Sequence, residues 1–467
     1  MNELIDKRIN QLEVNIVKSA QKVIRIKSVK SKPEQGKPFG DGINECLESF
    51  LNIAQILGLE TKNLDGYAGH VEIGEGDEIL GILCHLDVVP EGKNWSYSPY
   101  GGEIHDGRLY GRGSIDDKGP AIAALYALKA VKDSGENLNK RIRLIVGTDE
   151  ESGWEGLKYY LQNEESPDMA FSPDAEFPVI HGEKGILTFK LSKKFKNAFS
   201  KNIDELKIIG GNLPNMVPDY SQALLKTRYD EFIKEKMNNY FNNNSIHLEV
   251  EKKGDKISIN SFGKSAHGSL PEEGINAISQ LMVSLNKLDV IDGEIGEFIQ
   301  FYTEKIGMEY NGQSIGCKLE DEQSGKLTFN VGGINISEKS GEIIVNVRYP
   351  VTYSKETILE MMEETLEKYK LIYEELSHKR PLYVEKDNPL VEKLMKVYQD
   401  YTGDMSDAIT IGGGTYARAI ENAVAYGPLF PGEEELAHQK DEYIVIENLI
   451  LSSKIYGAAI LELAGNK

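Results

Sequence analysis

The chain has 467 residues, of which 40% are apolar and 27% charged, and its formal net charge is −21. This length exceeds one ordinary hydrophobic core and predicts two domains. The acidic balance argues against nucleic-acid binding, which needs a basic surface. No stretch approaches the roughly 18 apolar residues that suggest a membrane span, and the first residues lack the basic start and apolar core of a secretory signal. We therefore expect neither a nucleic-acid nor a membrane partner.

Three cysteines, Cys46, Cys84 and Cys317, are widely spaced and odd in number, so we expect no disulfide framework. Free cysteines fit a reducing cytoplasm, which is the location we predict. The negative net charge fits solubility and a site that concentrates cations, although surplus acid alone is only a weak indication of a metal.

In the first part of the chain, helical patterns alternate with apolar strands. An amphipathic helix is predicted at the N-terminus, and helices and buried strands follow in the order Glu45–Leu57, Ile79–Cys84, Pro120–Lys132, Arg141–Gly147 and Trp154–Leu161. The Ala-rich helix at Pro120 carries its proline in the first turn, where a missing N–H costs nothing. Such alternation predicts an α/β layer fold with both faces of the sheet covered.

Near Gly185 the pattern changes to shorter strands with two distinct faces. The predicted elements are strands at Gly185–Leu191, His247–Val250 and Lys256–Ile259, a hairpin over Lys326–Tyr349, and helices at Asn276–Leu288 and Lys355–Tyr369. After about Leu382 the α/β pattern returns and ends in a helical stretch, Asp441–Leu463. We predict an α/β domain with a central mixed sheet flanked by helices, built from residues 1–184 and 382–467. An α+β domain of residues 185–381 interrupts it.

The strongest local motif is Cys84-His85-Leu86-Asp87 at the end of an apolar strand. In α/β sheets, ligands bind outside the carboxyl ends of strands. A carboxylate two residues from a metal-bound histidine could orient its imidazole or contact a nearby base. The alternative is that His85 and Asp87 merely cap the strand.

Asp116 lies between a Gly-rich turn and the Ala-rich helix. The absence of a GxxxxGK[ST] pattern and the adjacent acid Asp117 argue against a phosphate-binding loop. A tight turn beside a helix start suits a carboxylate held rigidly in a cleft. The alternative is an ordinary helix cap, a common role for aspartate.

Three more positions carry groups of the same kind. Glu150 and Glu151 follow the second buried strand and repel each other unless a cation or a proton intervenes, which suits one ligand and one proton carrier. The alternative for this pair is a solvated loop. Asp174 follows a proline that fixes the local backbone, and His438 is the only histidine in the C-terminal part of the predicted α/β domain.

Together these positions offer a mixed nitrogen and oxygen set able to hold two divalent ions: His85, Asp116, Glu151, Asp174 and His438. Paired ions about 3.5–4 Å apart activate water at neutral pH and polarise a scissile carbonyl. Glu150 could then take the proton of the water and return it to the leaving amine. The sequence contains no HExxH motif that would support a rival hydrolase chemistry.

The motifs CHLDVVP, YGRGSIDDKGP, GTDEESGW, FSPDAEFP and GKSAHGS, with the late His438, resemble in order those of the M20 metallopeptidases. The resemblance is to the dipeptidase branch that includes bacterial dipeptidase V and carnosinase. It implies that His85 and Asp174 hold one ion and that Glu151 and His438 hold the other. Asp116 would bridge the two ions.

The same resemblance makes Glu150 the general acid/base, places Asp87 close to the site, and implies a cis peptide bond after Asp116. It also makes the inserted domain a lid, from which His267 would stabilise the oxyanion of the tetrahedral intermediate. Further positions resemble substrate-binding residues of this branch: Asn215, Arg348, Gly413, Gly414 and Thr415. Arg348 would clamp the free carboxylate of the substrate in a bidentate manner, and the glycine-rich segment would offer it backbone N–H groups. The alternatives are a surface arginine and a tight turn.

We therefore predict a metallopeptidase that hydrolyses unblocked dipeptides, including β-alanyl or Xaa-His peptides, with two divalent ions. Zinc is favoured, with manganese and cobalt as alternatives. An N-acyl amino-acid deacylase, such as succinyl-diaminopimelate desuccinylase, is the nearest alternative, and a non-catalytic binding protein on the same fold is another. In the dipeptidase V-like chains that this sequence resembles, an enlarged lid supplies its histidine within one chain. The insertion here is long enough for that arrangement, so the resemblance favours a monomer over a homodimer.

Overall fold

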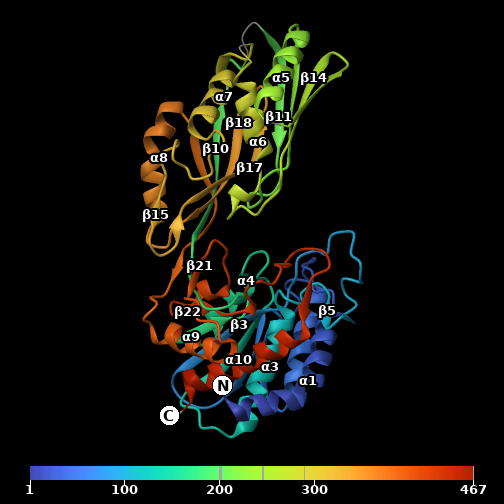
Figure 1. The fold of residues 1–467 in the computed structure, drawn as a ribbon, viewed down its shortest axis with the longest axis vertical. Coiled ribbons are helices and arrows are strands. Elements are labelled where there is room, and N and C mark those ends of the chain that lie inside the picture. The colour runs from blue at the N-terminus through green and yellow to red at the C-terminus, as the bar shows by residue number, and fades with distance from the viewer. Residues whose placement is uncertain (199–201, 245–246, 289, 466–467) are drawn as a thin grey trace. The chain divides into compact units, whose positions relative to one another are not determined.

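The computed structural model describes residues 1–198, 202–244, 247–288 and 290–465. The chain forms two compact units (Figure 1). Unit 1 comprises Met1–Gly182, Leu382–Thr410 and Gly414–Lys467, and unit 2 comprises Glu183–Pro381 and Ile411–Gly413. Among the helices of the described ranges, none is long and apolar enough to cross a membrane.

Unit 1 is built on a nine-stranded mixed sheet. Its strand order is β1-β2-β6-β3-β7-β22-β9-β20, with β21 paired to β9. The centre is parallel, because β3 (Ile79–His85) runs parallel to both β6 (Arg141–Gly147) and β7 (Met169–Ser172). Every residue of β3 is buried, as expected for a strand with both faces covered. The other strands are β1 (Glu60–Leu64), β2 (Ala68–Ile73), β9 (Ile180–Glu183), β20 (Leu382–Tyr383), β21 (Ile409–Ile411) and β22 (Ala423–Ala425).

The helices of unit 1 pack around this sheet. The Ala-rich helix α3 (Lys118–Ser134) contacts β3 and β6 and lies beside α1 (Glu3–Ile24) and α10 (Ile446–Ala464), as Figure 1 shows. Small side chains allow this close packing, and a Cβ added at Gly457 of α10 would lie only 2.7 Å from Ile5 Cγ2. The remaining helices are α2 (Asp41–Ile56), α4 (Glu155–Asn163) and α9 (Pro389–Thr402).

Two small sheets hold the loops of unit 1. In one, β5 (Arg108–Tyr110) pairs with both β4 (Glu103–His105) and β24 (Tyr443–Val445). In the other, β8 (Ala175–Glu176) pairs with β23 (Pro428–Leu429). The predicted helical stretch from Asp441 is therefore wrong at its start. Residues 443–445 are drawn into a strand by pairing with β5, and the helix begins at Ile446.

Unit 2 is an antiparallel eight-stranded sheet with helices. The strand order is β13-β14-β12-β11-β17-β18-β10-β19. The strands are β10 (Gly185–Lys194), β11 (Ile203–Gly210), β12 (Tyr220–Thr227), β13 (Leu248–Lys253), β14 (Lys256–Phe262), β17 (Thr328–Ile336), β18 (Ser340–Tyr349) and β19 (Ile372–Lys379). A separate short pair joins β15 (Glu320–Asp321) to β16 (Gly325–Lys326).

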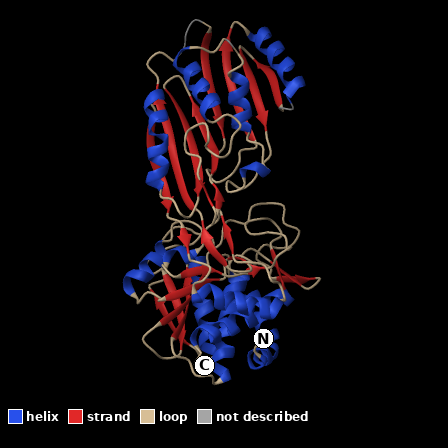
Figure 2. Ribbon diagram, turned by 60° about the vertical axis from the view of Figure 1, so that its left-hand side comes forward, coloured by secondary structure: helices blue, strands red, loops and turns tan. Residues whose placement is uncertain are grey.

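The two faces of the unit 2 sheet differ in chemistry. Alternate residues such as Leu187, Phe189 and Leu191 enter an apolar core that they share with the helices, which border the red strands in Figure 2. The helices are α5 (Asp230–Asn244), α6 (Ala277–Leu285), α7 (Gly293–Lys305) and α8 (Lys355–Tyr369). The opposite face carries polar residues, among them Thr188 and Asn346. The predicted fold class, a mixed α/β sheet interrupted by an α+β insertion, is confirmed.

Candidate metal centre

The predicted metal ligands of unit 1 lie at one edge of its sheet. His85 is the last residue of β3, Glu151 follows β6, and Asp174 follows β7. Because these three strands are mutually parallel, their carboxyl ends meet at the same edge. Asp116 comes from the turn before α3, and His438 from the loop after β23.

Asp116 lies at the centre of the cluster. Its Oδ1 is 2.9 Å from His85 Nε2, and its Oδ2 is 3.0 Å from His438 Nε2. Asp174 Oδ1 lies 3.5 Å from His85 Nε2, and Glu151 Oε1 lies 3.0 Å from His438 Nε2. The side chains thus form two groups of three that share Asp116. The Asp116 carboxylate faces the two imidazoles, so helix capping does not account for its position.

The chemistry of these groups suits divalent metal ions. Each group offers one imidazole nitrogen and two carboxylates, and within each group one ligand atom per residue lies within 4.8 Å of the others. The carbonyl oxygen of Asp87 lies 3.0 Å from His85 Nδ1, which leaves Nε2 facing the carboxylates. A backbone carbonyl is a common partner for the second nitrogen of a metal-binding histidine. The Asp116–Asp117 peptide bond is cis, as the resemblance implies.

The site concentrates opposite charges in a partly buried place, where His85 is buried and His438 is exposed. Burial lowers the pKa of His85, but Asp174 and Asp116 outweigh this effect and hold the pKa well above its usual value. Burial acts in the same direction on His438, where Asp116 and Glu151 raise the pKa to about 11. Burial raises the pKa of Asp174 to about 6 and also raises that of Glu151. Three partly buried carboxylates thus need positive charge nearby, which protonated imidazoles or metal cations can provide.

The general-base candidate Glu150 is held through its backbone and its side chain. Asp87 is 2% exposed, and its two carboxylate oxygens accept the N–H groups of Glu150 (3.0 Å) and Glu151 (3.1 Å). The indole Nε1 of Trp154 donates to Glu150 Oε1 at 3.0 Å. Asp87 therefore fixes the turn that carries both glutamates. Trp154 is the last residue of the GTDEESGW motif, but the sequence alone did not predict this contact.

A buried ion pair that the sequence did not reveal holds the Asp116 turn. Glu442 Oε1 accepts the N–H groups of Gly113 and Ile115, both at 3.0 Å, and that of Asp116 at 3.4 Å. Its Oε2 accepts Arg112 Nη1 at 2.5 Å, and neither side chain of the pair is more than 2% exposed. Burial raises the pKa of Glu442 to about 7, against the opposing effect of Arg112. The partners are 330 residues apart, so no local pattern could predict the pair.

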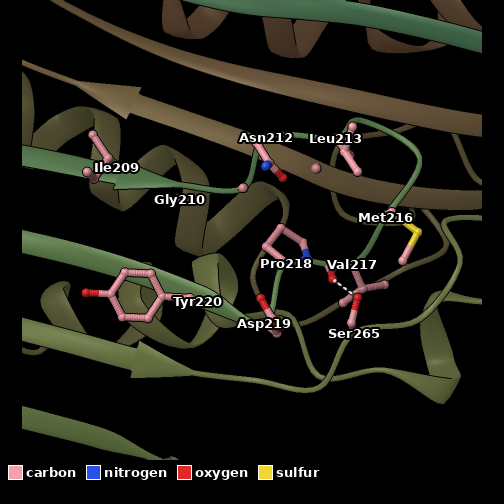
Figure 3. A pocket seen from close by; sticks show the side chains of 12 residues that line it. Ile209, Gly210, Asn212, Leu213, Met216, Val217, Pro218, Asp219, Tyr220 and Ser265 are labelled. Carbon is pink, nitrogen blue, oxygen red and sulfur yellow. Dashed lines mark hydrogen bonds between the residues drawn. The ribbon is translucent and has the colours of Figure 1, made fainter. Parts of the chain in front are cut away.

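Within unit 2, the predicted residues Asn215 and His267 lie on two loops that are joined by backbone hydrogen bonds. Gly268 N–H donates to Asn215 O at 2.6 Å, and Val217 N–H donates to Ala266 O at 2.9 Å. Figure 3 shows the first loop along a cavity of about 400 Å³, where Ser265 Oγ donates to Val217 O at 3.2 Å. His267 itself is exposed, and its Nδ1 lies 2.6 Å from Ser269 Oγ.

The remaining predicted substrate residues divide between the units. Arg348 of β18 is 5% exposed, so it is not the surface arginine of the alternative reading. Gly413 belongs to unit 2, whereas Gly414 and Thr415 belong to unit 1. The Thr415 hydroxyl accepts the N–H of Ala417 and so caps a short 3-10 helix.

In unit 1, the ends of parallel strands bring imidazoles and carboxylates together around one shared aspartate. This arrangement is typical of a metal-dependent hydrolase. Residues 81–462 match the sequence model described as Peptidase family M20/M25/M40, and the chain belongs to this family. It is a metallopeptidase that uses divalent metal ions and acts on peptides.

Two similar proteins carry the name "Putative dipeptidase". YtjP of Bacillus subtilis (strain 168) is 42% identical over 454 residues, which are 96% of this chain and 97% of that protein. SH1171 of Staphylococcus haemolyticus (strain JCSC1435) is 37% identical over 471 residues, with 98% of each chain covered. These relatives support a dipeptidase role.

Solved structures share the fold at low sequence identity. Human carnosine dipeptidase 1 superposes with a TM-score of 0.60 at 17% identity, covering 99% of both chains. The di-peptidase Dug1p from Saccharomyces cerevisiae gives a TM-score of 0.58 at 14% identity, covering 98% of both chains.

Proposed function

We propose that this metallopeptidase hydrolyses unblocked dipeptides at a centre of two metal ions. The observation that supports it best is the position of Asp116, whose two carboxylate oxygens each face a different imidazole. A shared carboxylate of this kind suits two adjacent ions. Zinc is the favoured metal for mixed imidazole and carboxylate ligands, with manganese or cobalt as alternatives.

In the proposal, His85 and Asp174 hold one ion, and Glu151 and His438 hold the other, with Asp116 shared. Bound metal ions would lower the pKa of the attacking water and polarise the scissile carbonyl. Glu150 accepts a proton from that water and returns it to the leaving amine. Its contact with Trp154 Nε1 orients the carboxylate for this transfer.

We further propose that unit 1 is the catalytic domain and that unit 2 is a lid. His267 would donate a hydrogen bond to the oxyanion, while Asn215, Arg348 and the segment Gly413–Thr415 would bind the substrate. Burial of Arg348 supports its assignment, because a desolvated guanidinium binds a carboxylate more strongly than an exposed one. We also propose that the protein is a monomer and that it resides in the cytoplasm, where its buried cysteines stay reduced.

The competing function is deacylation of N-acyl amino acids, which the same metal centre could perform. The test is a panel of free dipeptides, N-acetylated dipeptides and N-acyl amino acids, offered to metal-stripped protein resupplied with zinc, manganese or cobalt. The proposal expects metal-restored cleavage of the free dipeptides and slow turnover of both blocked classes. Cleavage of the N-acyl amino acids alone would establish the deacylase instead.

A further inference from the structure

Polar side chains form a buried row on the face of the unit 2 sheet that lies opposite its apolar core. Thr188 of β10 and Asn346 of β18 are direct cross-strand neighbours and are 7% and 2% exposed. Arg348 follows two residues later on β18, so it points to the same face. Burying polar groups is costly unless they are hydrogen-bonded, so each needs a partner.

These three side chains bond in series. Asn346 Nδ2 donates to Thr188 Oγ1 at 2.8 Å, and Arg348 Nε donates to Asn346 Oδ1 at 3.0 Å. Arg348 Nη1 then donates to the carbonyl oxygen of Gly412 at 2.9 Å. A guanidinium can only donate, so the amide oxygen of Asn346 must face Arg348 and its NH₂ must face Thr188. The series therefore has one chemically consistent orientation.

We propose that Asn346, anchored by Thr188, is a positioning residue that presets the Arg348 guanidinium for the carboxylate of the substrate. The inference rests on the proposed function in assigning that carboxylate to Arg348. A free arginine side chain has considerable rotamer entropy, and fixing its Nε and one Nη before binding lowers the cost of ordering it. Asparagine suits this position because it accepts from Nε without neutralising the guanidinium charge. An aspartate there would compete with the substrate for Arg348.

The test compares a dipeptide with its C-amidated form, using metal-loaded protein and the variants Asn346→Asp and Thr188→Val. For the free dipeptide, Asn346→Asp should raise KM about ten- to a hundredfold, in keeping with a charge-assisted hydrogen bond, and change kcat far less. The slower cleavage of the amide should be unaffected. Thr188→Val should raise KM for the free dipeptide by a smaller factor. Asn335→Asp, the same change at an exposed position of β17, is the matched control.

Equal losses on the free and the amidated substrate would overturn the inference, because a purely structural role lowers both. If the wild-type protein cleaves no dipeptide, the proposed function is refuted, but the positioning role of Asn346 is not yet decided. In that case, calorimetric binding of an N-acetyl amino acid and of its amide tests the role of Asn346, because only the acid carries a carboxylate. Selective loss of the acid's affinity in Asn346→Asp supports the inference, and equal affinities in variant and wild type refute it. If Asn346→Asp fails to fold, Thr188→Val gives the same comparison.

Discussion

The two units place their polar residues by different means. In unit 1, parallel strands bring the predicted ligands to one sheet edge, and buried charges such as Glu442 hold the intervening turns. In unit 2, all described pairings of the large sheet are antiparallel, and the candidate residues lie on a strand face or on paired loops. Unit 1 thus brings many charged groups together at one edge of its sheet, whereas unit 2 orients a few neutral and cationic hydrogen-bond donors. The following experiments test whether this difference is functional.

The largest effect is expected for Glu150→Gln. Removing the proton acceptor should lower kcat by about 10²–10⁴-fold, while the metal content measured by mass spectrometry stays at the wild-type value. Glu155→Gln, an exposed neighbour on α4, is the control and should remain active. Full activity of Glu150→Gln would remove the residue from the mechanism and weaken the assignment of chemistry to unit 1.

The next largest effect is expected for the buried Arg112–Glu442 pair, which holds the turn that carries Asp116. Glu442→Gln leaves Arg112 without its charged partner and loosens the turn, so metal affinity should fall about 10–100-fold, as for other residues that orient ligands. The free energy of unfolding should also fall, by up to about 3–5 kcal/mol. Competition with a fluorescent zinc chelator measures the first quantity, with the exposed Glu434→Gln as the control. Unchanged metal affinity would mean that Glu442 serves stability alone.

Metal removal should affect the two units unequally. Once the metals are removed, only protonated imidazoles balance the charges of the carboxylates in unit 1, so the segments that carry them are held less firmly. Backbone hydrogen exchange in the segments that follow β3, β6 and β7 should therefore become faster. The amides of β17 and β18 should keep their protection. Because metals displace protons from His438, whose pKa is about 11, metal affinity should rise with pH. Equal deprotection of both units would contradict the comparison.

The smallest effect is expected at His70, away from the metal centre. Burial lowers its pKa to about 4, so the folded state keeps it neutral, with its Nδ1 2.9 Å from Tyr160 OH. The unfolded chain binds a proton near pH 6.5, so stability is lost as pH falls from about 6.5 to 4, by up to about 3 kcal/mol. Denaturant titrations of metal-free protein should show a flatter pH dependence for His70→Gln. If the slope of the unfolding free energy against pH is the same in His70→Gln as in the wild type, His70 is not the source of the pH dependence.

The sequence by itself determined the elements with strong periodicity and the class of the site. The apolar strands Ile79–Cys84 and Arg141–Gly147 were found almost at their true bounds, because buried parallel strands are apolar throughout. Their ends located His85 and Glu151, and the order of the motifs identified the family. These features are local, so sequence patterns carry them.

Only the tertiary structure decided which groups share a contact. The helix predicted from Asp441 gave way to a strand because β5, more than 300 residues earlier, supplies its partner. Glu442 with Arg112 and Thr188 with Asn346 are likewise pairings between segments far apart in the chain, which no local pattern reveals. Hydrogen bonds depend on distances and directions of a few tenths of an ångström, which the packing of remote segments sets.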